Sequence, residues 1–114
     1  MTAKVPPRVK PRSRRQPKPA PPKILPPYHV VLLNDEHHTF AYVIDLLQRV
    51  FGHPADKAFK LTEQIHRQGK AAVWTGQKEV AEFKADRVRG FGPDFFADTT
   101  VKFPLGVVIE PAAS

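Results

Sequence analysis

The stretch YHVVLLNDEHHTFAYVIDLLQRVF, residues 28–51, contains two hydrophobic patterns joined by a short polar segment. Its first part, Tyr28 to Asn34, is apolar and rich in β-branched residues, which is typical of a strand that ends in a polar turn. Its last part repeats large apolar residues at helical spacing, with Thr39 as the expected N-cap and Gly52 as the stop. The stretch therefore predicts a strand, a turn over residues 34–38 and a helix.

The rest of the globular region continues with short patterns bounded by glycine and proline. They predict a helix from about Pro54 to Gly69, a strand over 70–75, a helix over 77–89 and a strand over 104–110. Residues 94–103 have no period, but Phe91, Phe95, Phe96 and Phe103 are too apolar to be left wholly in water, so we expect a packed loop. The order β-α-α-β-α-β predicts a small α+β domain, with a three-stranded antiparallel sheet packed against three helices.

Residues 1–27 have a different composition from the remainder of the chain. They hold 9 of the 13 prolines and 8 of the 18 Lys and Arg, without any Asp or Glu. Such a segment has too few large apolar groups to offset the entropy of ordering. We therefore expect a disordered or polyproline-like extension over 1–27 and one folded domain over 28–114.

The high net charge of +7 belongs to this extension. Without it the chain has 10 Lys and Arg (18 − 8) against 11 Asp and Glu, a formal charge of −1. A folded nucleic-acid reader normally has a basic face, so nucleic acid is not expected as the main ligand. A small RNA- or ribosome-associated protein that uses its basic arm is the alternative function.

Catalysis, metal binding and membrane insertion find little support in the residues. The chain has no Cys, and its only serines are Ser13 and Ser114, so a nucleophile on a rigid scaffold is missing. The five histidines lack the spacing of a zinc site, and no apolar run approaches the ~20 residues of a membrane span. We expect a non-enzymatic protein without a cofactor or metal, located in the bacterial cytoplasm, with the plastid stroma as the second choice.

Capture of an amine fits the remaining polar groups. An α-ammonium has three donors and no acceptor. Asn34 offers an amide oxygen, Asp35 a carboxylate and His66 a ring nitrogen, beside the apolar residues Val43 and Ile65 of two predicted helices. The alternative is structural: Asn34 and Asp35 cap a turn and His66 caps a helix. Spacing alone leaves both interpretations open.

Three segments stand out in combination: VVLLNDEHHTFAYVIDLL (30–47), QIHRQGKA (64–71) and EVAEFK (79–84). Together they resemble the ClpS family of Clp protease adaptors. The resemblance covers about residues 28–89 and the last strand, and it depends on residue type, order and spacing in combination. It implies a compact α+β domain of three strands and three helices behind a flexible N-terminal extension.

The resemblance also implies an adaptor that binds proteins through a bulky N-terminal residue, an N-degron beginning with Leu, Phe, Tyr or Trp. By this similarity the α-amino group is held by Asn34, Asp35 and His66. The positions that line or rim the hydrophobic pocket would be Glu36, His38, Phe40, Val43, Thr62, Ile65 and Leu105. The implied partner is the N-terminal domain of a ClpA-like AAA+ unfoldase, with Glu79 and Lys84 on the docking surface.

Three positions depart from the pattern of the resembled family. Thr62 stands where a long methionine-like side chain is usual, and we expect the extra room to admit N-terminal Ile or Val. His38 stands where a small hydroxyl residue is common. Residues 91–103 form a longer segment than the family needs.

Overall fold

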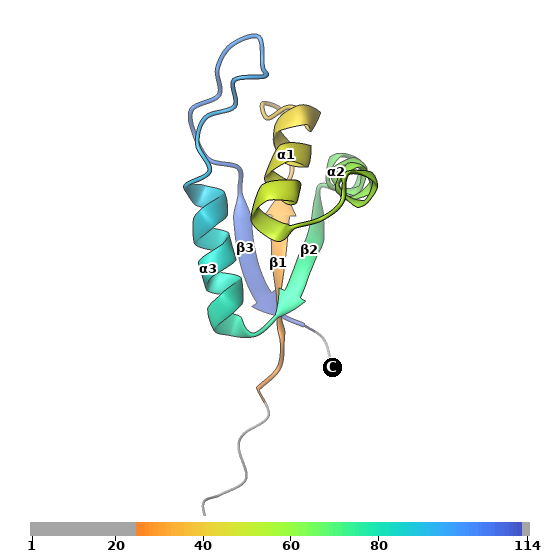
Figure 1. The fold of residues 1–114 in the computed structure, drawn as a ribbon, viewed down its shortest axis with the longest axis vertical. Coiled ribbons are helices and arrows are strands. Elements are labelled where there is room, and N and C mark those ends of the chain that lie inside the picture. Colours follow the sequence, from red (N-terminus) through yellow and green to blue (C-terminus); the bar gives the residue numbers. More distant parts are fainter. Residues whose placement is uncertain (1–24, 113–114) are drawn as a thin grey trace, which may run out of the picture.

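The computed structural model describes residues 25–112 and has the predicted α+β architecture. Its elements are β1 (Tyr28–Leu33), α1 (Phe40–Phe51), α2 (Ala55–Gln68), β2 (Lys70–Gly76), α3 (Lys78–Arg89) and β3 (Val107–Pro111). β1 is the central strand and pairs antiparallel with β2 on one side and β3 on the other. α1 lies between α2 and α3 (Figure 1). The predicted element order and the three-stranded antiparallel sheet are confirmed.

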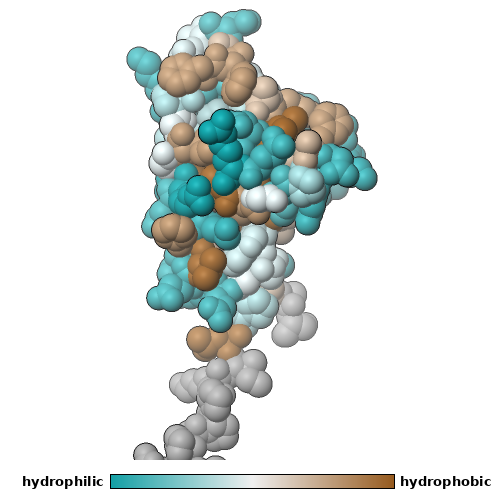
Figure 2. All heavy atoms as spheres, in the orientation of Figure 1, coloured by the Kyte–Doolittle hydropathy of each residue, from teal (hydrophilic) through white to brown (hydrophobic). Residues whose placement is uncertain are grey.

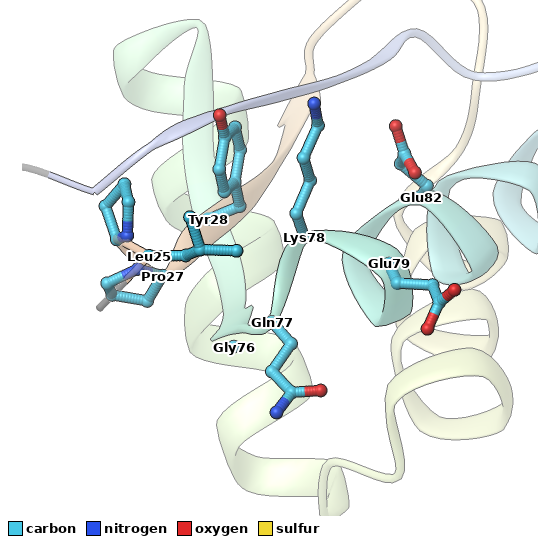
Figure 3. A pocket seen from close by; sticks show the side chains of 9 residues that line it. Leu25, Pro27, Tyr28, Gly76, Gln77, Lys78, Glu79 and Glu82 are labelled. Atoms are coloured by element: carbon cyan, nitrogen blue, oxygen red, sulfur yellow. The ribbon is translucent and has the colours of Figure 1, made fainter. Parts of the chain in front are cut away.

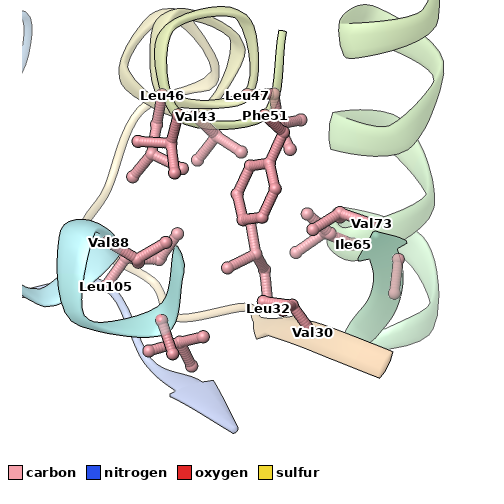
Figure 4. Packing of buried hydrophobic residues seen from close by; sticks show 14 of the residues in the cluster. Val30, Leu32, Val43, Leu46, Leu47, Phe51, Ile65, Val73, Val88 and Leu105 are labelled. Carbon is pink, nitrogen blue, oxygen red and sulfur yellow. The ribbon is translucent and has the colours of Figure 1, made fainter. Parts of the chain in front are cut away.

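The helices pack against one face of the sheet because alternate strand residues point toward them. Val30 and Leu32 of β1 are fully buried, and the apolar side chains of α1 point toward them (Figure 4). The core is completed by residues from every other element, including Ile65 of α2, Val73 of β2 and Val88 of α3. The end of β1 and the start of α1 are thereby held against the same core.

α1 begins and ends at the residues that the sequence indicates. The hydroxyl of Thr39 accepts a hydrogen bond from the backbone N–H of Tyr42 at 3.1 Å, and Gly52 ends the helix with φ 72°. A left-handed φ costs glycine little because it has no Cβ. α2 and α3 begin one residue later than predicted, since Pro54 and Gln77 are their N-caps.

The last strand is shorter than predicted: β3 begins at Val107 instead of Pro104. Proline has no N–H for a ladder, and Leu105 turns into the core. The carbonyl of Gly106 accepts a hydrogen bond from the N–H of Leu33 at 2.9 Å, just beyond the paired residues. The expected disordered extension falls on residues 1–24, which lie outside the described residues, and on the short stretch 25–27.

The segment between α3 and β3 differs most from expectation. Phe91 packs against the core and Phe103, 48% exposed, packs against His37 and His38, but Phe95 and Phe96 are 74% and 60% exposed, so the prediction of a packed loop is wrong for these two. The segment is held instead by polar bonds around Asp94, which is fully buried. These bonds order the backbone without burying the phenylalanine rings.

In the part of the chain that the structure describes, no helix combines the length and the apolar character needed to cross a bilayer.

Candidate functional site

A cavity of about 350 Å³ lies between the 34–38 turn, the start of α1 and the last turns of α2. Its lining residues are Asn34, Asp35, Glu36, His38, Thr39, Phe40, Val43, Thr62, Ile65 and His66. The sequence suggested ten residues for this site (three for the amine and seven for the pocket), and nine of them line the cavity. The exception is Leu105, which is buried in the core. Thr39 was missed, because its N-cap pattern pointed only to a structural role.

One backbone hydrogen bond sets the distance between the two ends of the site. The N–H of Asn34, just after β1, donates to the carbonyl of Gly69 at 2.8 Å. Gly69 ends α2 with φ 88°, and its own N–H donates to the carbonyl of Ile65 at 2.9 Å. Asn34 and the last turn of α2, which carries His66, are therefore fixed against each other by the main chain.

The side chains of Asn34 and His66 have no hydrogen-bond partner within residues 25–112. The ring of His66 packs edge-on against Phe40, with centroids 5.4 Å apart. Neither side chain caps the turn or the helix, so the structural alternative does not account for them. Both present free polar atoms to the cavity.

Asp35, in contrast, caps the turn. One carboxylate oxygen accepts the N–H groups of His37 and His38 at 2.8 and 2.7 Å, and the other lies 2.6 Å from Nδ1 of His38. Burial pushes the pKa of this carboxyl up, but the hydrogen bonds from His38 and His37 outweigh it and leave the pKa below its ordinary value. Asp35 is therefore ionised at neutral pH and gives the cavity a negative charge.

His38 connects the 34–38 turn to the backbone of Phe103. Its side chain is buried, with Nδ1 facing Asp35 and Nε2 lying 3.0 Å from the carbonyl oxygen of Phe103. Both ring nitrogens therefore lie within hydrogen-bond distance of oxygens of the protein. Its polar atoms are occupied within the protein and are not free for a ligand.

The floor of the cavity is apolar. Val43 of α1 and Ile65 of α2 are buried, and Thr62 beside them is equally enclosed. The hydroxyl of Thr62 donates to the carbonyl of Ala58 at 2.8 Å, one turn earlier in α2. Thr62 therefore brings no unsatisfied polar atom to the floor, and its contribution to the cavity is its shape.

A larger groove of about 940 Å³ lies where the chain enters β1 and α3 begins (Figure 3). It is lined by Leu25, Pro26, Pro27, Tyr28, Gly76, Gln77, Lys78, Glu79 and Glu82. Size favours this groove as a binding site, but the converging free polar groups and the apolar floor are in the smaller cavity. The smaller cavity is therefore the candidate site for a small ligand.

The two predicted docking residues have different surroundings. Glu79 lines the larger groove at the first turn of α3. Lys84 is half-buried: its Nζ donates to the carbonyl of Val50 at 3.3 Å and lies 5.7 and 5.4 Å from the ring centroids of Phe51 and Trp74. Lys84 thus has a structural role at the end of α1 that the sequence did not indicate.

Among the residues that the structure describes, no three His, Asp or Glu side chains come together as a set that could hold a metal ion.

Comparison with known proteins identifies the family. Residues 23–94 match the family model described as "ATP-dependent Clp protease adaptor protein ClpS". The chain belongs to the ClpS family. This is a family of adaptors of the Clp protease, and membership does not favour the alternative of an RNA- or ribosome-associated protein.

Bacterial ClpS relatives agree with the family match. The ClpS adapter of the Synechocystis strain PCC 6803 is 41% identical over 71 residues, which cover 61% of this chain and 72% of the relative. The ClpS adapter of Nautilia profundicola is 38% identical over 83 residues, which cover 73% of this chain and 79% of the relative.

A solved ClpS structure shares the fold. It is Agrobacterium tumefaciens ClpS2 bound to L-phenylalaninamide, with a TM-score of 0.62 and 30% sequence identity. The match covers 76% of this chain and 98% of the Agrobacterium chain.

Proposed function

We propose that the small cavity binds the N-terminal residue of a protein and that the chain delivers such proteins to a Clp AAA+ unfoldase. The α-ammonium would be held by Asn34, Asp35 and His66, and a bulky side chain would lie on Val43 and Ile65. The observation that carries the proposal is the pair of free polar side chains, Asn34 and His66, next to an apolar floor.

The polar groups match an α-ammonium in number and in charge. The ammonium donates three hydrogen bonds and accepts none, and its pKa of about 7.7–8.0 keeps it mostly charged at neutral pH. The oxygen of Asn34, the carboxylate of Asp35 and a ring nitrogen of His66 are acceptors that line the cavity. Glu36, also at the rim, adds a second negative charge.

The Agrobacterium complex supports this choice of ligand. L-phenylalaninamide carries a free α-amino group, an aromatic side chain and an amide in place of the carboxylate, so it resembles an N-terminal Phe residue of a longer chain. The present cavity lies at the lower end of the ~300–1,000 Å³ range of small-ligand sites. It suits a single side chain such as Leu, Phe, Tyr or Trp.

The partner for delivery would contact the start of α3. Glu79 lies in the groove beside the point where the N-terminal extension joins β1 (Figure 3). An unfoldase domain seated there would also lie next to residues 25–27, and we propose that the extension over 1–27 assists delivery. Lys84 is a less direct test of this surface, because its side chain already stabilises the end of α1.

Fluorescence anisotropy with peptides that differ only at the first residue tests the binding step. Acetylating a Phe peptide removes the charge and two donors, which should weaken binding about 100-fold. His66→Ala should weaken the free-amine peptide about tenfold through a lost charge-assisted bond. Arg67→Ala, the exposed neighbour, is the matched control and should bind as the wild type does.

Equal binding of the free and acetylated peptides would refute the proposal. Delivery is measured separately, as degradation of a reporter with N-terminal Phe by a Clp protease with and without this chain. A rate that does not respond to the chain would remove the delivery step while leaving the binding step in place.

A further inference from the structure

Three exposed phenylalanines lie close together in sequence on the segment between α3 and β3. Phe95, Phe96 and Phe103 are 74%, 60% and 48% exposed. Apolar spheres gather over this segment, at the end of the molecule where α1 begins (Figure 2). Exposed aromatic rings in a group indicate a contact surface more often than isolated ones do.

The segment is built firmly onto the protein. The buried carboxylate of Asp94 accepts the N–H of Thr39 at 2.7 Å and the N–H of Phe96 at 2.9 Å. Asp94 and Val101 also exchange two backbone hydrogen bonds, at 2.8 and 3.1 Å. The hydroxyl of Tyr42 donates to the carbonyl of Gly92 at 2.6 Å. The segment therefore presents its exposed rings from a fixed position.

Phe103 alone among the three contacts the turn that borders the cavity. Its ring lies edge-on to His37 and His38, with centroids 5.4 and 5.2 Å apart, and its carbonyl oxygen faces Nε2 of His38. His38 lines the cavity. In the described residues neither Phe95 nor Phe96 has a ring contact with the 34–38 turn.

We propose that Phe103, with the exposed ring of His37 beside it, forms a second apolar subsite for the bound protein N-terminus. It would receive a large apolar side chain at the second or third residue, after the first residue has entered the cavity. An extended chain advances about 3.3–3.6 Å per residue, so one or two residues suffice to cross from His38 to Phe103. The inference rests on the proposed function and names a further determinant of substrate choice.

Two pairs of peptides that begin with Phe test the subsite. One pair has Leu or Ala as the second residue, and the other pair has Leu or Ala as the third residue. Covering the exposed face of Phe103 should make the Leu peptide bind about fivefold tighter than the Ala peptide, at one of the two positions. Phe103→Ala should reduce this preference to less than about twofold and leave the requirement for a free amine unchanged. Phe95→Ala, on the same segment, is the control and should keep the preference.

Phe103→Ala retains the backbone carbonyl that faces His38. Phe103→Gln repeats the test with a smaller loss of side-chain volume. A Leu-to-Ala preference that is absent from the wild type, or that survives in both Phe103 variants, would overturn the subsite alone. Loss of the free-amine requirement in the wild type would overturn the proposed function and the subsite together.

Discussion

The polar groups around the cavity fall into two classes on its two sides. On the side of the turn and α1, the polar atoms of Asp35, His38 and Thr39 are all used within the protein. On the other side, Asn34 and His66 have main-chain positions fixed by Gly69 but free side chains. The first side builds the site, and its Asp35 also brings a negative charge to the cavity, while the second side offers acceptors that no other described residue uses. Substitutions on the two sides should therefore affect different measurements.

The largest effect is expected at Asp94, which supports the building side. Asp94→Ala leaves the N–H of Thr39 without its partner and removes a fully buried carboxylate that accepts several bonds. The free energy of unfolding should fall by about 3 kcal/mol, measured by urea denaturation. Asp98→Ala, an exposed carboxylate on the same segment, is the matched control and should change it by less than about 0.5 kcal/mol.

His66→Ala should show the opposite result, with weaker peptide binding and an unchanged denaturation curve. If Asp94→Ala leaves stability unchanged, or His66→Ala lowers it as much, the division into a building side and a binding side is wrong.

An intermediate effect is expected on the floor, where Thr62 acts by shape. Thr62→Met places a longer side chain into the cavity and should weaken peptides that begin with Ile or Val about fivefold relative to Phe. Thr62→Val keeps the branched shape without the hydroxyl and should retain the wild-type ranking. Identical rankings for wild type and Thr62→Met in peptide titrations would show that Thr62 does not set the preference.

The smallest effect concerns the pH dependence of the turn. Burial acts to raise the pKa of Asp35, but the hydrogen bonds of the turn hold it below its ordinary value in the folded protein. The contribution of Asp35 to stability is therefore present above the ordinary pKa and is lost as the pH falls through the lowered pKa. The stability advantage of wild type over Asp35→Asn should therefore narrow in acid-denaturation measurements below pH 4. Glu36→Gln, at an exposed neighbouring position, is the control, and its stability should change with pH as that of the wild type does. If the stability of Asp35→Asn also follows the wild type below pH 4, the turn does not depend on the charge of Asp35.

Local signals made most of the fold predictable from the sequence. Thr39 and Gly52 mark the two ends of α1, and the alternation around Val30 and Leu32 marks the buried face of β1. These features need only neighbouring residues. Residue chemistry pointed to Asn34, Asp35 and His66 beside Val43 and Ile65, and the resemblance to the ClpS family supplied the other predicted residues of the candidate site.

Long-range contacts account for what the sequence did not indicate. Asp94 reaches Thr39 across 55 positions, and Lys84 reaches Val50 across 34. No periodic pattern in the sequence indicates either contact. The buried bonds of Asp94 order residues 94–103 while Phe95 and Phe96 stay exposed, and the sequence alone did not indicate this role. Leu105 was assigned to the pocket by similarity, but its side chain is enclosed in the core.

The bond between the N–H of Asn34 and the carbonyl of Gly69 has a kinetic consequence. Because it joins the end of the central strand to the end of α2, the main-chain positions of Asn34 and of the last turn of α2 are already set before a ligand arrives. A preformed site does not wait for a slow rearrangement, and its association rates vary little among related ligands. Different peptides should therefore arrive at similar rates, and the adaptor should discriminate among them by how long each one stays.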